Sequence, residues 1–141
     1  MAKQMDLPKN SEPSSIRDTF AWIEEASSDG WARVRMPIRQ RHRNATEATS
    51  AVQGGVVISL ADRALVNASN SVLAAGYTTA TTELKANLIA VAWEGELIAE
   101  CRLIHRGRHL HVGDIEVKDR TGRLIAKVSG TNLVIDQREA V

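Results

Sequence analysis

Two adjacent glycines, Gly54 and Gly55, and the carboxylate of Asp62 are the residues of this 141-residue chain whose types and spacing suggest a reaction centre. They lie at the start and in the middle of an apolar segment that the sequence predicts to be a helix. A helix N-terminus presents unpaired N–H groups and a positive dipole end to an oxygen that gains negative charge. Glycine lets a ligand approach the backbone closely because it has no Cβ.

Asp62 is the stronger indication of function. A carboxylate in an otherwise apolar helix is costly to bury without a partner, so we expect it to bind a ligand or to act in acid–base chemistry. Structural interpretations stand beside both indications. The glycines by themselves are more typical of a helix start that packs against a sheet. Asp62 is equally compatible with exposure to solvent or with a pair to Arg63 or to an arginine elsewhere.

The helix that positions these residues is predicted over residues 53–75, with Gly76 as its stop. A helix that is apolar around most of its circumference is typical of a buried, central element. The apolar residues in it are Val56, Val57, Leu60, Ala61, Ala64, Leu65, Ala68, Val72 and Leu73.

Alternating segments predict the remaining elements. We expect strands at residues 31–38, 78–90, 97–105, 110–118 and 124–135, and a short helix that starts at Ser15 and ends at the Asp29–Gly30 turn. Turns as short as those between the last four strands require antiparallel pairing. The sequence therefore predicts the α+β class, with an antiparallel sheet wrapped around one long helix.

Composition indicates a single ordinary domain. We expect a flexible tail over residues 1–14, a domain over 15–136 and a polar tail over 137–141. A net charge of +1 gives no indication of nucleic-acid binding. No apolar run resembles a secretory signal or a membrane span, and Cys101 is the single cysteine, so we expect a cytoplasmic protein without membrane partners.

Five motifs in order resemble one known family. They are Gln53–Gly54–Gly55 followed by Leu60–Ala61–Asp62, the Thr-rich entry at residues 78–82, the turn at Gly95, the His105–Arg106–Gly107–Arg108 turn, and Gly122 followed by Gly130–Thr131. This pattern, over residues 31–134, resembles the hotdog-fold acyl-CoA thioesterases of the phenylacetate-degradation (PaaI-like) type, in the 4-hydroxybenzoyl-CoA thioesterase superfamily.

The resemblance implies hydrolysis of an acyl-CoA thioester. Asp62 would be the nucleophile or general base, the N–H of Gly54 would polarise the carbonyl, and Thr81 would assist the attacking water. The family often places an asparagine in the loop upstream of the glycines, which matches Glu47 without a gap and Asn44 only with a longer loop. The main departure is Gln53, where the family commonly has histidine; glutamine donates a hydrogen bond but does not titrate near neutral pH.

Substrate binding and assembly complete the prediction. Gly55, Arg106 and Arg108 are candidates for binding coenzyme A, the arginines through its phosphates, although solvated arginines are commoner. Asp62 lies about 12 Å beyond Gly54 along a helix. One carbonyl therefore needs two antiparallel copies, as in the family, and we expect a homodimer that assembles to a homotetramer.

Neither a metal nor a separate cofactor is expected, since the His109–His111 pair has no third ligand in the sequence and a surface pair is the simpler interpretation. Two rival functions remain. One is a non-hydrolytic acyl-CoA or acyl-carrier binding protein of the same fold, suggested by Gln53. The other is a structural domain whose helix serves only as core.

Overall fold

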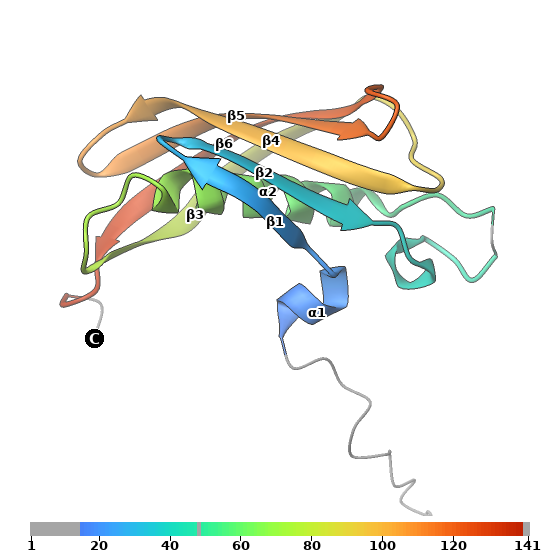
Figure 1. Cartoon of the computed structure of the whole chain (residues 1–141), viewed down its shortest axis with the longest axis horizontal. Helices are drawn as coiled ribbons and strands as arrows, with labels where there is room; N and C mark the ends of the chain where they lie inside the picture. The colour runs from blue at the N-terminus through green and yellow to red at the C-terminus, as the bar shows by residue number, and fades with distance from the viewer. Residues whose placement is uncertain (1–14, 48, 140–141) are drawn as a thin grey trace, which may run out of the picture.

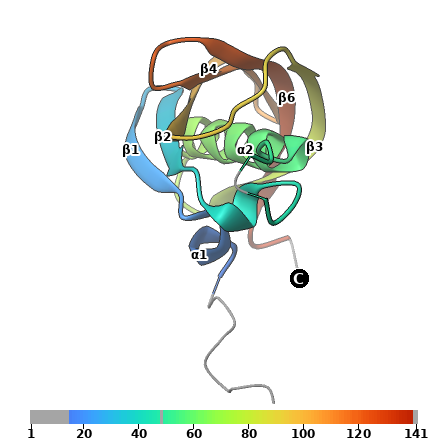
Figure 2. The same ribbon diagram turned by 90° about the vertical axis from the view of Figure 1, so that its right-hand side faces the viewer.

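One sheet of antiparallel strands curves around the long helix α2 (Figures 1 and 2). The computed structural model describes residues 15–47 and 49–139, so the predicted tail at 1–14 and the last two residues of the predicted C-terminal tail lie outside the described residues. The elements are α1 (Ile16–Phe20), β1 (Ile23–Ser28), β2 (Trp31–Pro37), the 3-10 turn η1 (Gln40–His42), α2 (Gly54–Asn70), β3 (Tyr77–Leu88), β4 (Glu96–Arg106), β5 (Leu110–Asp119) and β6 (Leu124–Asp136).

The six strands lie in the order β1-β2-β4-β5-β6-β3, and every neighbouring pair is antiparallel. This arrangement confirms the predicted α+β class and hotdog architecture. β1 and β3 form the two edges. None of the described helices is both long and apolar enough to cross a membrane.

The predicted first helix is too long, because only residues 16–20 are helical. Ala21 ends α1 with a left-handed backbone, and the chain then runs as β1 against β2, from Ile23 opposite Arg35 to Ser28 opposite Trp31. Asp29 and Gly30 both have positive φ angles of 50° and 78°, which suit the tight turn of a hairpin. The Asp29–Gly30 pair therefore forms the turn of a hairpin and does not end a helix. Residues 23–28 form a strand despite the helical spacing of their apolar residues, because they pair with β2.

Helix α2 is buried on the side that faces the sheet and partly open on the other. Its helical segment ends at Asn70, five residues before the predicted end. One stripe of the helix is not fully buried; it consists of Gly55, Ser59, Asp62 and Val66. The prediction that α2 is buried around most of its circumference is therefore correct only for the side that faces the sheet. The buried apolar residues of α2 are Val57, Leu60, Ala61, Ala64, Leu65 and Ala68.

Two glycines allow α2 to lie close to the sheet. Gly113 of β5 and Gly130 of β6 are directly opposite each other, and the side chain of Leu65 lies over both. A Cβ at Gly113 would lie 2.5 Å from one Leu65 methyl, and a Cβ at Gly130 would lie 2.6 Å from the other. Since Leu65 is completely buried, it has little room to move away.

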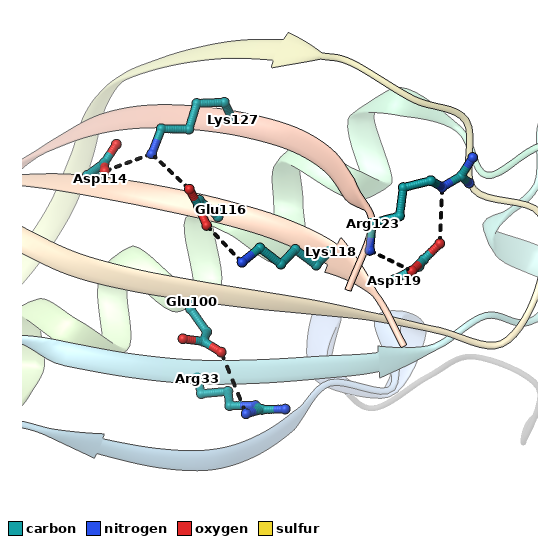
Figure 3. Close-up of polar contacts among 8 residues, drawn as sticks. All are labelled: Arg33, Glu100, Asp114, Glu116, Lys118, Asp119, Arg123 and Lys127. Carbon is teal, nitrogen blue, oxygen red and sulfur yellow. Dashed lines mark hydrogen bonds and ion pairs between the residues drawn. The ribbon is translucent and has the colours of Figure 1, made fainter. Parts of the chain in front are cut away.

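The outer face of the sheet is covered by charged side chains that pair with one another. Arg33 contacts Glu100 across β2 and β4, and Lys127 on β6 contacts both Asp114 and Glu116 on β5 (Figure 3). Lys118 also contacts Glu116. Each exposed pair contributes little stability by itself, but together these pairs leave few uncompensated charges on this face.

The side chain of His42 connects α1 to the turn that leads into α2. This histidine is 1% exposed, and its ring stacks on Phe20. The N–H of Arg39 donates to its Nδ1 at 3.0 Å, and its Nε2 lies 3.3 Å from the carbonyl oxygen of Thr19. Burial lowers the pKa of His42, the contact with Thr19 opposes this, and Arg41 and Arg39 lower it further.

We expect the Gly130→Ala substitution to destabilise the protein by about 1–3 kcal/mol, because the new methyl group overpacks the contact with Leu65. The free energy of unfolding in urea measures this effect. Ser129→Ala, at the neighbouring exposed position of β6, is the control and should change stability by less than about 0.5 kcal/mol. Equal stabilities of the two variants would contradict the close approach of α2.

Acidification should reduce stability through His42. Its pKa in the folded protein is below the ordinary value of 6.5, so the unfolded chain binds the proton first. The contribution is complete above pH 6.5 and is lost as the pH falls through the lowered pKa. Unfolding free energies between pH 7.5 and 5 should fall less steeply in His42→Asn than in the native protein. The exposed-histidine variant His109→Asn is the control and should keep the native slope. If His42→Asn also kept the native slope, another group would be responsible for the loss of stability.

Candidate active site

The first turn of α2 presents free backbone donors. Gln53 is the N-cap, and its side-chain oxygen accepts the N–H of Val56 at 3.1 Å. Within the described part of the chain, the N–H groups of Gly54 and Gly55 donate no hydrogen bond to another residue. These two donors and the positive end of the helix dipole are available to an oxyanion, as the sequence predicts.

Both glycines also lie close to neighbouring side chains. A Cβ at Gly54 would lie 2.7 Å from a methyl of Leu88, and a Cβ at Gly55 would lie 2.7 Å from Oε1 of Gln53. Gln53 thus uses its oxygen as a helix cap and keeps its amide nitrogen as a donor. The packing and functional interpretations of the glycine pair are therefore compatible, because the close contacts leave the N–H groups free.

A short hydrogen-bond network holds this helix start in place. The N–H of Gln53 donates to the carbonyl of His42 at 2.9 Å, and the N–H of Val52 donates to the carbonyl of Ala92 at 3.0 Å. His42 therefore fixes the entry to α2 through its backbone, while its side chain contacts α1 and η1. The start of α2 is restrained on two sides by segments that are distant in the sequence.

Asp62 and Thr81 are brought together by the packing of α2 on β3. The hydroxyl of Thr81 donates to Oδ1 of Asp62 at 2.6 Å, although the residues are nineteen positions apart. Both side chains are only partly buried. The hydroxyl orients the carboxylate and leaves its second oxygen available for a water molecule or a carbonyl carbon.

The expected alternative partner of Asp62 is engaged elsewhere. Arg63 donates through Nε to Glu24 at 2.7 Å, and its guanidinium lies over the ring of Trp22. Among the described residues, Asp62 makes no ion pair. The pairing with Arg63 that the sequence left open is therefore wrong in this structure.

A second polar contact beside Thr81 fixes the same helix. Asn132 of β6 lies directly opposite Thr81, and its side-chain nitrogen donates to Oγ of Ser69 at 2.9 Å. Asp62 and Ser69 are seven residues apart and so lie on the same side of α2. This contact was not predicted from the sequence, where the available signal is an asparagine at an apolar position of the alternating segment 124–135.

The two halves of the predicted centre are separated within one chain. Residues 54–70 are helical throughout, so Asp62 lies about 12 Å from Gly54 along the axis, as the sequence predicts. Leu88 contacts Gly54, whereas Thr81 contacts Asp62, so the halves also lie at different positions of β3. One chain therefore does not place the glycine N–H and the carboxylate on the same small group.

The upstream loop candidates form contacts within their own loop. The side chain of Asn44 donates to the carbonyl of Ala51 at 3.2 Å, and the carbonyl of Glu47 accepts the N–H of Ser50 at 2.9 Å. Both residues are exposed. Roles for Asn44 and Glu47 in a second subunit's site stay predictions.

The two candidate arginines of the β4–β5 turn, Arg106 and Arg108, differ in their contacts. Arg106 pairs with the carboxylate of Asp29 at 2.8 Å and also contacts its backbone carbonyl, so it holds the β1–β2 turn. Arg108 makes no ion pair within the described residues and lines a pocket of about 320 Å³. The pocket lies beyond the C-terminal end of α2; Tyr77, His109, His111, Val134 and Asp136 are among its other lining residues.

His111 is not the surface residue that the sequence suggested. It is 5% exposed because its side chain points inward from β5, and its Nδ1 has no hydrogen-bond partner among the described residues. Burial lowers its pKa, as do the nearby His105 and Arg106. Residues 15–47 and 49–139 contain no group of three His, Cys, Asp or Glu placed to hold a metal ion.

Cys101 is a buried core residue on β4. Burial raises the pKa of its thiol to about 12, with a further increase from Asp114, opposed by Arg102. A thiol in this state is not a nucleophile at neutral pH. Cys101 is therefore not a candidate nucleophile.

Comparisons with known proteins agree with this arrangement. A family model described as the thioesterase superfamily matches residues 50–126. A putative esterase of Archaeoglobus fulgidus is 35% identical over 104 residues, which are 73% of this chain and 64% of that protein. The chain thus spans less than two thirds of the length of this relative.

Three solved structures share the fold. A mutant of a thioesterase enzyme from Staphylococcus aureus has a TM-score of 0.79 at 27% identity, over 84% of this chain and 97% of that one. The PaaI protein of Escherichia coli, from the phenylacetic acid degradation operon, has a TM-score of 0.76 at 23% identity, covering 85% and 83%. A Bacillus halodurans protein solved with CoA has a TM-score of 0.77 at 24% identity, covering 85% and 78%.

The family match includes the start of α2, Asp62 and Thr81, which carry the candidate site. The resemblance to hotdog thioesterases that the motifs indicated is thereby confirmed. Since the matching model covers more than half of the chain, this protein belongs to the thioesterase superfamily.

Proposed function

We propose that this protein is an acyl-CoA thioesterase whose reaction centre is built by two copies of the chain. The observation that carries the proposal is the hydrogen bond from Thr81 to Asp62 on the open face of α2, in a member of the thioesterase superfamily. A carboxylate held by one hydroxyl, with no cation beside it, is suited to attack or to activate water.

The chemistry follows from the available groups. In one route, Asp62 takes a proton from water as the water oxygen attacks the thioester carbonyl; in the other, the carboxylate attacks directly and water then hydrolyses the anhydride. In both routes the carbonyl oxygen becomes negative, and the N–H of Gly54 from the other chain stabilises it. The carbon–sulfur bond then breaks, and the coenzyme A thiolate leaves and takes up a proton.

A homodimer supplies both halves of this centre. The 12 Å between Gly54 and Asp62 exceeds the reach of one carbonyl, whereas two antiparallel α2 helices place the glycine of one chain near the carboxylate of the other. The partly open stripe of Gly55, Ser59, Asp62 and Val66 is suited to face such a copy. We expect these dimers to assemble into homotetramers, as in the sequence-based prediction.

Arg108 is the stronger of the two candidates for coenzyme A. Its guanidinium lines the pocket at the end of α2 without an ion pair in the described chain, whereas Arg106 is occupied by Asp29. Guanidinium groups bind phosphates through paired hydrogen bonds. The B. halodurans protein of the same fold was solved with CoA, which supports this ligand class.

The remaining predicted groups have supporting roles. Gln53 retains the two N–H groups of its amide to orient the thioester, and the loop with Asn44 and Glu47 is expected to reach the partner's site. Coenzyme A enters only as part of the substrate, without a separate cofactor. A cytoplasmic location is consistent with the reduced thiol of Cys101.

Replacing the carboxylate tests the proposal directly. We expect Asp62→Asn to lower acyl-CoA hydrolysis at least about a hundredfold, because the amide neither attacks nor accepts a proton. Thiol release from short, long and aromatic acyl-CoA esters measures the loss. Asp114→Asn, on the outer sheet face, is the matched control and should retain native turnover; full activity of Asp62→Asn would remove this residue from the mechanism.

Variants of the two arginines should distinguish a residue that binds coenzyme A from one that holds a turn. We expect Arg108→Ala to raise KM for acyl-CoA about tenfold and to leave KM for an acyl-N-acetylcysteamine thioester unchanged, since that substrate lacks phosphates. Arg106→Ala should instead leave KM for both substrates unchanged, because Arg106 is held by Asp29 at the β1–β2 turn. Equal effects of Arg108→Ala on both substrates would argue against a phosphate contact.

The non-hydrolytic binding protein remains the second candidate, since Gln53 cannot titrate where the family commonly has histidine. Its signature would be a thermal shift with acyl-CoA and no release of thiol. Hydrolysis by the native protein excludes it.

A further inference from the structure

Four planar side chains, here called the aromatic stack, connect the middle of α2 to the turn η1. They are Arg63 of α2, Trp22, Phe20 of α1 and His42 of η1. The guanidinium carbon lies 5.8 Å from the centre of the indole ring. The indole and phenyl rings lie 4.9 Å apart, and the phenyl and imidazole rings 6.3 Å apart, with each pair within 12° of parallel. These are the distances of stacking and cation–π contacts, so the four groups attract their neighbours in series.

The aromatic stack joins two positions of the same helix. At one end, Arg63 belongs to α2 and directly follows Asp62. At the other end, the carbonyl oxygen of His42 accepts the N–H of Gln53, the N-cap of α2, at 2.9 Å. Gln53 and Arg63 are ten positions apart in the sequence, which corresponds to about 15 Å of helix. The stack and the first half of α2 therefore form a closed loop of contacts.

The imidazole of His42 is fixed by contacts at both of its nitrogens. The N–H of Arg39 donates to Nδ1 at 3.0 Å, and Nε2 lies 3.3 Å from the carbonyl oxygen of Thr19. Phe20 covers a face of the ring. A side chain held on three sides leaves its own backbone little freedom. The carbonyl group that receives the N–H of Gln53 is therefore in place only while α1 is in place.

Helix α1 depends in turn on the aromatic stack. It has five residues, which is too short for a helix to be stable by itself, and none of them is buried. Phe20 and Trp22 pack against the edge of the hydrophobic core. Arg63 is kept over the indole ring by Glu24, which accepts its Nε–H at 2.7 Å. Loss of the indole ring should therefore release Phe20, and with it the support of His42.

We propose that the aromatic stack positions the oxyanion donors of the reaction centre, with Phe20 and Trp22 as positioning residues that act through Gln53. The inference rests on the proposed function, in which the N–H of Gly54 stabilises the negative carbonyl oxygen. This N–H lies in the peptide plane that begins at Gln53, so its direction follows the backbone that His42 holds. A hydrogen bond weakens steeply when it is misaligned, and a loosened donor stabilises the transition state less.

A second anchor of the helix start does not involve the aromatic stack. The N–H of Val52 donates at 3.0 Å to the carbonyl oxygen of Ala92, in the connection between β3 and β4. Loss of the stack should therefore loosen the anchor at Gln53 and leave the anchor at Val52 intact. The two neighbouring amides serve as probe and internal control.

Amide hydrogen exchange measures both anchors without a substrate. In Trp22→Leu, we expect the Gln53 N–H to exchange at least about tenfold faster and the Val52 N–H to stay within about twofold of the native rate. Trp22→Phe keeps an aromatic ring in the stack and should exchange like the native protein. Trp31→Leu, which removes an indole from the outward face of β2, is the matched control. Phe20→Leu breaks the stack at its centre and supplies the same test if Trp22→Leu does not fold.

Kinetics decide whether this anchor serves the reaction. Trp22→Leu should lower kcat for acyl-CoA hydrolysis about tenfold and leave KM within about twofold, because the oxyanion donors act on the transition state. Trp22→Phe and Trp31→Leu should keep the native kcat. A residue with only a structural role would change the unfolding temperature and leave kcat unchanged at temperatures where the variant is folded.

Unchanged exchange of the Gln53 N–H in Trp22→Leu and Phe20→Leu would overturn the proposal. Faster exchange with a native kcat would overturn it as well, since the stack would then hold the helix start without positioning the donors. A failure of the proposed function is distinguishable from both. If the native protein released no thiol from acyl-CoA while Trp22→Leu still exchanged faster at Gln53, the hydrolase would be overturned and the restraint by the stack supported.

Discussion

The structure depends on how closely α2 lies against the sheet. Leu65 fits over Gly113 and Gly130, which are paired on neighbouring strands and offer no side chain in its way. This contact sets the height and direction of the helix, and the sheet curves around it (Figure 2). The neighbouring stripe of the helix, which includes Asp62, remains partly open. The Asp62 carboxylate therefore stays accessible to a substrate or a second copy, because it is the apolar side of the helix that packs against the sheet.

Two polar contacts fix the rotation of the helix within that packing. Thr81 holds Asp62, and its cross-strand partner Asn132 holds Ser69. Directional contacts of this kind prevent the helix from turning about its axis, which apolar packing alone allows more easily. The hydrogen bond from Thr81 also orients the carboxylate of Asp62.

Charged side chains on the outer face of the sheet differ in their contacts from those on its β3 edge. On the outer face the charged residues compensate one another across the strands (Figure 3). On the β3 edge, the exposed Glu83 and Lys85 form no ion pair within the described residues, and they lie beside backbone groups that no described strand pairs with.

The amino-acid sequence by itself determined the long helix, the antiparallel strands and the place of Asp62 eight residues beyond Gly54, because these follow from local spacing. It misassigned residues 23–28 as helix, since only the pairing with β2 makes them a strand. The motifs also indicated Thr81, but its hydrogen bond to Asp62 and the divergence of Arg106 from Arg108 were decided by tertiary structure. Such contacts join residues far apart in the chain, and no local pattern specifies which side chains the packing will bring within 3 Å of each other.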